Sequence, residues 1–166
     1  MGQGFHSWHY STVQATLTRD RVLAPICPNS GCGITLIDRQ FLHQQRPGIQ
    51  ELPTPCGVTI RPVGNQPLRT NTYVAVDVYL PGHRPGSPNC VAKIYVKAYV
   101  VEHLAANVLL GSDTLGLYKM VINYRSHELL VGSCPGFRAP LRVITKGSAP
   151  NVRQVVKALE TTTVPA

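Results

Sequence analysis

Apolar and polar side chains alternate most regularly between residues 70 and 80 (TNTYVAVDVYL). In an extended chain, successive side chains point to opposite faces of a sheet. Val74, Val76, Val78 and Leu80 therefore share one face, while two tyrosines and an alanine share the other with Asp77. The pattern predicts a half-buried strand over these residues.

Shorter stretches of the same kind recur between clusters of glycine and proline. Apolar and β-branched residues dominate them and turn residues bound them, which is typical of strands. Residues 91–101 (VAKIYVKAYVV) form the second long candidate, and 120–122 with 128–131 are expected to make a hairpin. Further strands are predicted at residues 13–17, 22–27, 35–37, 57–60, 108–111 and 141–144, with turns or loops at 61–67 and 81–90.

Two short helices interrupt this pattern. Asp38 precedes residues 39–45 and can cap a helix there, since an aspartate side chain accepts the first free backbone N–H groups. Ser112 or Asp113 can cap a second helix over residues 114–117. The central domain is predicted to span residues 10–134. Residues 1–9 are expected to be a lead-in, and 135–166 a strand, linker or arm with a helical turn near 152–159.

The composition agrees with one compact domain rich in turns. Of the 166 residues, 43% are hydrophobic and only 14% are charged, and there are 14 glycines and 14 prolines. So many helix breakers leave room for short strands and short helices only. Without any internal repeat, the chain is predicted to be all-β, a closed barrel with two short helices.

The charge and the cysteines exclude several classes of protein. The net charge of +8 is scattered along the chain and forms no basic run, so nucleic acid is not expected as the main partner. No apolar stretch reaches the roughly 18 residues of a membrane span. The five cysteines have neither disulfide-framework nor zinc spacing, and no metal or cofactor is expected. An intracellular, cytoplasmic location with small, reduced, mostly buried cysteines is predicted.

Two segments carry the candidate chemistry. Residues 22–38 (VLAPICPNSGCGITLID) place an Asn29-Ser30-Gly31 loop between two apolar strands, and residues 107–124 (NVLLGSDTLGLYKMVINY) place Leu109-Leu110-Gly111 before a short helix. The pair resembles the retropepsins, most closely the protease segment of fungal Ty3/gypsy-type retrotransposon polyproteins. In that family the loop reads D-[ST]-G.

This resemblance implies a single acid-protease lobe that works as a homodimer, because one chain carries one loop and the catalysis needs two. Ser30 would hold the paired loops together, and Gly31 would allow close backbone approach. A flap from residues 58–76, with Val63-Gly64-Asn65 at its tip, would close over a peptide or polyprotein substrate. Leu110 and Gly111 would support the substrate site. Relatives of this kind are endopeptidases that mature a polyprotein, sometimes inside a retroelement particle.

Asn29 departs from the family pattern at its centre. Its amide can donate and accept hydrogen bonds but cannot take a proton from water as a general base. The chain is therefore predicted to lack proteolytic activity as written. A non-catalytic dimerisation or peptide-binding module is the alternative function, and a basic barrel that contacts RNA is a third. The change to asparagine has three candidate origins: a degenerate element copy, a domesticated descendant, or a deliberate substitution.

Two residues near these segments invite a sharper interpretation. Asp113, in S-D-T-L-G, suggests a displaced D-T-G motif, but Leu115 breaks that motif and a position at a helix start is favoured. Cys32 lies just after the loop, where a reactive thiol is conceivable, and a buried structural role is favoured.

Overall fold

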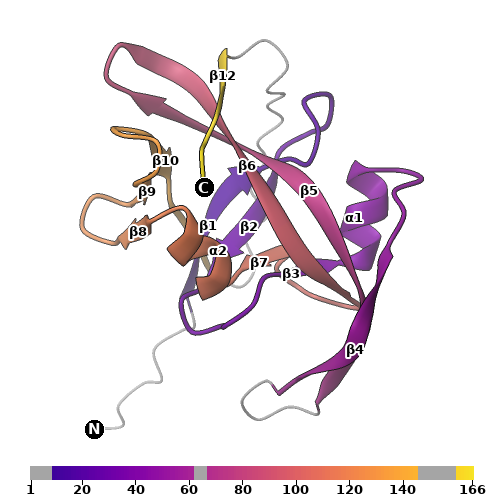
Figure 1. The fold of residues 1–166 in the computed structure, drawn as a ribbon. Helices are drawn as coiled ribbons and strands as arrows, with labels where there is room; N and C mark the ends of the chain where they lie inside the picture. Colours follow the sequence, from indigo (N-terminus) through magenta and orange to yellow (C-terminus); the bar gives the residue numbers. More distant parts are fainter. Residues whose placement is uncertain (1–8, 62–66, 146–159) are drawn as a thin grey trace, which may run out of the picture.

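The fold was obtained as a computed structural model that describes residues 9–61, 67–145 and 160–166, without the side chains of residues 9, 143–145 and 160. Strands dominate it, and they follow one another around a curled sheet (Figure 1). In chain order the elements are β1 (His9–Ala15), β2 (Ala24–Pro28), β3 (Leu36–Asp38), α1 (Arg39–Gln45), β4 (Leu52–Ile60), β5 (Leu68–Arg84), β6 (Ser87–Val101), β7 (Val108–Leu110), α2 (Ser112–Leu117), β8 (Met120–Asn123), β9 (Glu128–Val131), β10 (Arg138–Pro140), β11 (Arg142–Thr145) and β12 (Glu160–Thr163).

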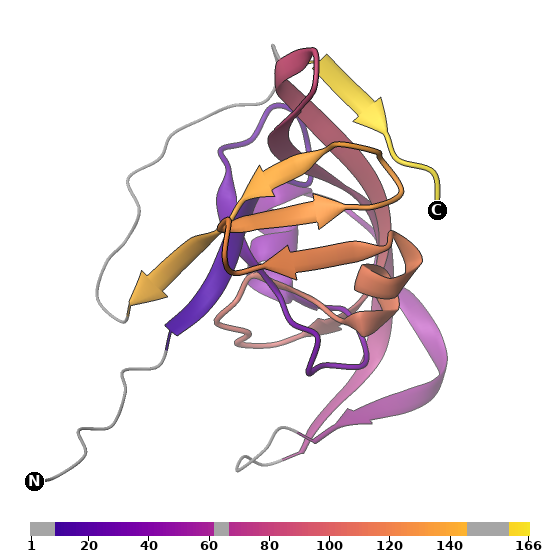
Figure 2. The same ribbon diagram turned by 90° about the vertical axis from the view of Figure 1, so that its left-hand side faces the viewer.

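The sheet brings together strands that are far apart in sequence. Its order in the described part of the chain is β11-β1-β2-β7-β3-β6-β5-β10-β9-β8, with β4 paired to β5 and β12 paired to β6. The β5–β6 ribbon runs through the whole molecule, and the β8–β9 hairpin and β10 lie beside it (Figure 2). This arrangement confirms the prediction of an all-β fold with short helices.

Alternation along β5 and β6 builds the core as predicted. Val74, Val76, Val78 and Leu80 are almost completely buried, and the alternating residues of β6 from Ile94 to Val100 are buried opposite them. Burying one large aliphatic side chain stabilises the folded state by about 1.5–3 kcal/mol relative to leaving it exposed to water. The pleat therefore decides which side of the ribbon faces the barrel interior.

The prediction of a loop at residues 81–90 is wrong. Antiparallel pairing continues from Pro81 opposite Val91 to Arg84 opposite Ser87. The turn itself is only Pro85-Gly86, and Gly86 has φ of 81°. Proline followed by a glycine with positive φ is the signature of a tight type II turn, so the sequence carried this signal.

The helices agree closely with the sequence pattern. Asp38 accepts a hydrogen bond from the backbone N–H of Phe41 at 3.0 Å and caps α1 at the predicted residue. The second helix begins earlier than expected, at Ser112, and its N-cap is Gly111, which has no side chain to offer. Asp113 therefore lies in the first turn, and its carboxylate accepts hydrogen bonds from Thr35.

Strands also occur beyond residue 134. The predicted strand at 141–144 appears as β11, which pairs with β1. Two further strands, β10 and β12, had no clear signal in the sequence because each is only three or four residues long. The predicted helical turn at 152–159 lies outside the described residues.

Candidate functional site

The loop that follows Pro28 is anchored at both ends to the same strand. β2 pairs in parallel with β7 through Cys27 and Pro28, and β3 pairs antiparallel with β7 through Leu36. The residues between β2 and β3 therefore form a loop that begins and ends beside β7. The loop carries Asn29-Ser30-Gly31 at its start, so the sheet places this triplet at a defined position.

Asn29 holds the loop with its backbone and its side chain. Its N–H donates to the carbonyl of Leu110 at 2.9 Å, and its own carbonyl accepts from the N–H of Cys32 at 3.2 Å. The side-chain Oδ1 accepts from the N–H of Gly31 at 2.9 Å. Oδ1 acts here only as an acceptor, which a carboxylate oxygen could do equally well.

The backbone of Gly111 packs directly against the far end of the same loop. A Cβ atom on Gly111 would come closer than 3.0 Å to the backbone N, C and O of Ile34. The N–H of the next residue, Ser112, donates to the carbonyl of Cys32 at 2.7 Å. The loop and the start of α2 therefore touch backbone to backbone, and only glycine fits at that contact.

A buried hydroxyl cluster beneath the loop joins the two sequence segments. The Thr35 hydroxyl donates to Asp113 Oδ1 at 2.7 Å, and the Thr35 N–H donates to Oδ2 at 3.0 Å. The same hydroxyl accepts from the N–H of Gly111 at 3.0 Å and lies 2.6 Å from the Thr114 hydroxyl. Sequence reasoning missed Thr35, since a lone threonine in a strand carries no local signal for such a cluster.

The other predicted site residues have different environments. Ser30 and Gly31 are exposed in the single chain. The side chain of Leu110, predicted to support the substrate site, is 0% exposed in the single chain. It faces the barrel interior because the strand alternates, and half-buried Leu109 is its neighbour on the opposite face. Val63, Gly64 and Asn65 lie outside the described residues.

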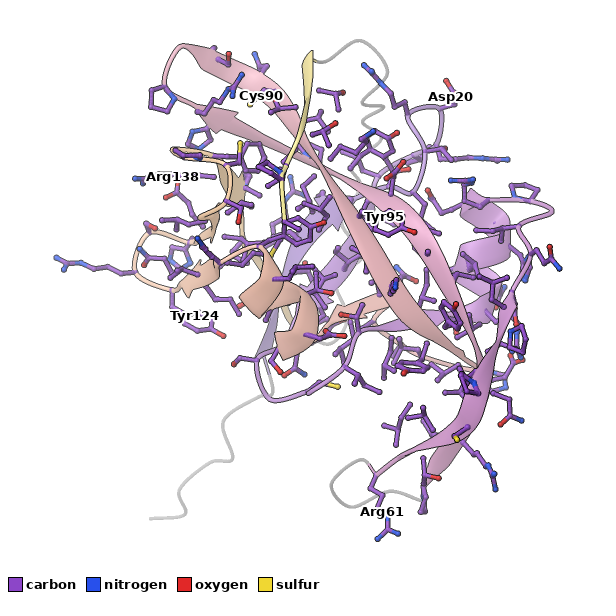
Figure 3. All side chains as sticks on the ribbon, viewed as in Figure 1. Asp20, Arg61, Cys90, Tyr95, Tyr124 and Arg138 are labelled. Atoms are coloured by element: carbon purple, nitrogen blue, oxygen red, sulfur yellow. The ribbon has the colours of Figure 1, made fainter. Side chains whose placement is uncertain are left out.

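A groove of about 640 Å³ opens between the barrel and β4, whose last residues belong to the predicted flap. Ile34 belongs to the same loop as Asn29 and forms part of its wall, although Asn29 does not line the groove within one chain. Arg61, labelled in Figure 3, directly follows the last residue of β4 and shows where this strand ends. The complete lining is Ile34, Thr54, Pro55, Cys56, Val58, Tyr73, Lys97, Ala98, Tyr99 and Asp113.

Charged groups hold the start of β4, which we call the flap base because β4 leads into the predicted flap. Glu51, just before β4, accepts from the guanidinium of Arg39 at 2.8 and 3.0 Å and from the Thr72 hydroxyl at 2.8 Å. His43 lies 3.1 Å from the same carboxylate, and Arg39 also bonds Glu102. These bonds, chiefly those from Arg39, lower the pKa of Glu51 to about 2. The carboxylate is therefore charged at any ordinary pH.

No group of three or more His, Cys, Asp or Glu side chains gathers in a way that suits a metal ion in the described part of the chain. No disulfide joins the five cysteines; Cys27, Cys90 and Cys134 are buried, Cys32 is half-buried and Cys56 is exposed. Within the same ranges, no helix is long and apolar enough to cross a membrane.

A curled sheet of this strand order, with the Asn29 loop hydrogen-bonded to β7 and β4 paired to β5, is the retropepsin-like fold. One solved structure with this fold is the retroviral protease-like domain of Ddi1 from Leishmania major, which matches with a TM-score of 0.58. The two sequences are 17% identical, and the match covers 84% of this chain and 98% of that domain. No family model and no curated protein matches the sequence. At this identity the likeness establishes the fold alone.

Proposed function

We propose that this chain is one half of a homodimeric retropepsin-like domain that binds an extended peptide without cleaving it. The observation that carries the proposal is the Oδ1 of Asn29, which accepts a hydrogen bond from the N–H of Gly31. By its resemblance to D-[ST]-G, the triplet would place Asn29 where the family has its catalytic aspartate. The loop geometry would therefore be maintained by a residue that offers no carboxylate.

The chemical argument rests on the pair of loops that a dimer would bring together. Aspartic proteases activate water with two facing carboxylates that share one proton. Two Asn29 side chains would present neutral amides, which cannot accept that proton. An origin in a Ty3/gypsy-type polyprotein would fit the two motifs, and the corresponding relatives would retain the aspartate.

A second copy has a suitable surface beside the loop. Leu117, Val121 and Tyr124 are more than half exposed although they are large and apolar. Val121 and Tyr124 also line a hollow of about 490 Å³ that includes Ser30. β8 ends the sheet order and has a strand neighbour on one side only in the described part of the chain. Pairing of two copies here would bury the patch and bring the loops together.

The peptide site is the groove under the flap. Its wall combines apolar and aromatic side chains with Lys97, and its rim is the β4 strand. An extended peptide can add main-chain hydrogen bonds to such a strand while its side chains enter the groove. This supports retention of peptide binding after the loss of catalysis.

The decisive experiment compares the chain with its Asn29→Asp variant on a peptide library at about pH 5, where a carboxylate pair can share one proton. We expect cleavage by the Asp variant only, with inhibition by a statine-type peptide. Asn29→Ala is the matched control and should not cleave. A dimeric Asp variant without activity would leave the binding module as the surviving function, and cleavage by the parent chain would refute the proposal.

The dimer surface is tested separately by sedimentation. Val121→Asp places a charge in the exposed patch and should give monomers, because a desolvated, unpaired charge opposes association. Tyr95→Asp is the control, since Tyr95 is also about half exposed but lies on β6 and does not line the hollow beside the loop. Equal association of both variants would show that the second copy docks elsewhere.

A further inference from the structure

The edge of β6 that faces away from β5 is covered by three different partners. β12 pairs with it in parallel at Cys90–Lys93, and β3 pairs in parallel at Tyr99–Val101. Between them, the Tyr118 hydroxyl accepts from the N–H of Tyr95 at 2.9 Å and donates to its carbonyl at 2.8 Å. An uncovered strand edge is a template for another chain, so the nature of each cover matters.

β12 is attached to β6 by main-chain pairing and by one buried side chain in the described part of the chain. It consists of Glu160–Thr163, and the next residue, Val164, donates its N–H to the carbonyl of Lys93 at 2.9 Å. Val164 is 4% exposed and belongs to the main core, whereas Thr161 and Thr162 are half-buried and Thr163 is exposed. One buried valine contributes about 1.5–2 kcal/mol, much of which ordering the segment offsets.

The surface beneath β12 has the features of a strand-accepting site. Cys90, Val91 and Ala92 are at most 1% exposed with β12 in place. Main-chain hydrogen bonds along such an edge supply affinity, and a pocket for one side chain supplies selectivity. Figures 1 and 2 show β12 along the part of β6 near the β5–β6 turn, at the opposite end of the ribbon from β4, and Figure 3 labels Cys90 there.

We infer that the β6 edge at Cys90–Lys93 is a binding site for an extended peptide rich in β-branched residues, with a valine at the anchoring position. Residues 160–164 (ETTTV) are its resident and exchangeable ligand. The chain's own segment fills the site here. The same residues on a separate molecule are expected to fill it once that segment is dislodged.

The test uses the full chain with Val164→Asp, which puts a charge into the core pocket and should release the segment. The probe is a fluorescent peptide, ETTTVPA, that copies residues 160–166. Saturable binding to this variant is expected, at least about tenfold tighter than to the parent chain, because an occupied site reduces apparent affinity. Thr163→Asp is the matched control: it adds the same charge at an exposed neighbour and should behave like the parent.

Two results would overturn the inference. One is a failure of the peptide to bind a Val164→Asp variant that retains the parent's circular dichroism. The other is equal binding of a probe in which the valine is replaced by aspartate. If Val164→Asp does not fold, Val164→Ala trims the anchor without adding charge. The probe must then bind Val164→Ala more tightly than the parent chain, because a weakened resident segment competes less well. Asn29→Asp should not change the affinity, which separates this site from the proposed peptide groove.

Discussion

The loop around Asn29 and the base of the flap around Glu51 are both parts of the candidate site, but different forces hold them. The loop is fixed by backbone hydrogen bonds, a glycine contact and a buried hydroxyl cluster. The flap base is fixed by a partly exposed ion-pair network centred on Arg39. Backbone packing hardly responds to pH or salt, whereas exposed ion pairs respond to both. The loop around Asn29 is therefore held rigidly, whereas the segment that leads into the predicted flap is held by weaker, adjustable forces.

The largest effect should come from Gly111→Ala. The new methyl group would overlap the backbone of Ile34, which cannot rotate away as a flexible side chain can. We expect a loss of about 3 kcal/mol in the free energy of unfolding, measured by urea denaturation. Gly116→Ala is the control, because nothing lies within 4 Å of its added Cβ and it is in α2. It should be neutral or slightly stabilising. Similar losses for both would contradict the close-contact explanation.

Thr35→Val should have the next largest effect. It keeps the shape of the side chain but removes the hydroxyl that donates to Asp113 and accepts from Gly111, so the buried N–H of Gly111 loses this acceptor. A loss of about 2 kcal/mol is expected. Thr59→Val, on an exposed position of β4, should change stability by less than about 0.5 kcal/mol. A small effect at Thr35 would mean that the cluster does not hold the loop.

Glu51→Gln should have a smaller effect, about 1–2 kcal/mol, because it removes the charge on the hydrogen bonds to Arg39 but keeps the shape. The loss should shrink at high salt, since the network is partly exposed. Glu102→Gln is the control, with a side chain that is 58% exposed, and should cost less. Equal effects in low and high salt would argue against an electrostatic flap base.

The smallest effect is the pH dependence that this network adds. The folded-state pKa of Glu51 is lowered from 4.5 to about 2. Its contribution is therefore fully present above the unfolded pKa and is lost as the pH falls from about 4.5 towards 2. Unfolding midpoints of the parent chain should decline over this window more steeply than those of Glu51→Gln. Parallel profiles would show that Glu51 is not the group responsible.

Parts of the fold that depend on neighbours in sequence were predictable. Alternation over residues 70–80 specified the buried face of β5, and Asp38 specified the start of α1. The Pro85-Gly86 turn has a local signal, but the neighbouring prolines and glycines predict a longer loop, because these residues usually interrupt strands. β12 was missed for a better reason: a strand of four residues has no periodicity to read, and its partner lies 70 positions away at Cys90.

The sequence by itself determined that the chain is all-β, that Asn29-Ser30-Gly31 lies in a loop between apolar strands, and that no carboxylate stands at Asn29. These follow from side-chain chemistry and from periodicities that act over a few residues. Only the tertiary structure decided that Thr35 meets Asp113, 78 positions later, that Gly111 abuts Ile34, and that Leu110 points into the core. Such contacts depend on strand register, and a shift of one residue exchanges every inward side chain for an outward one.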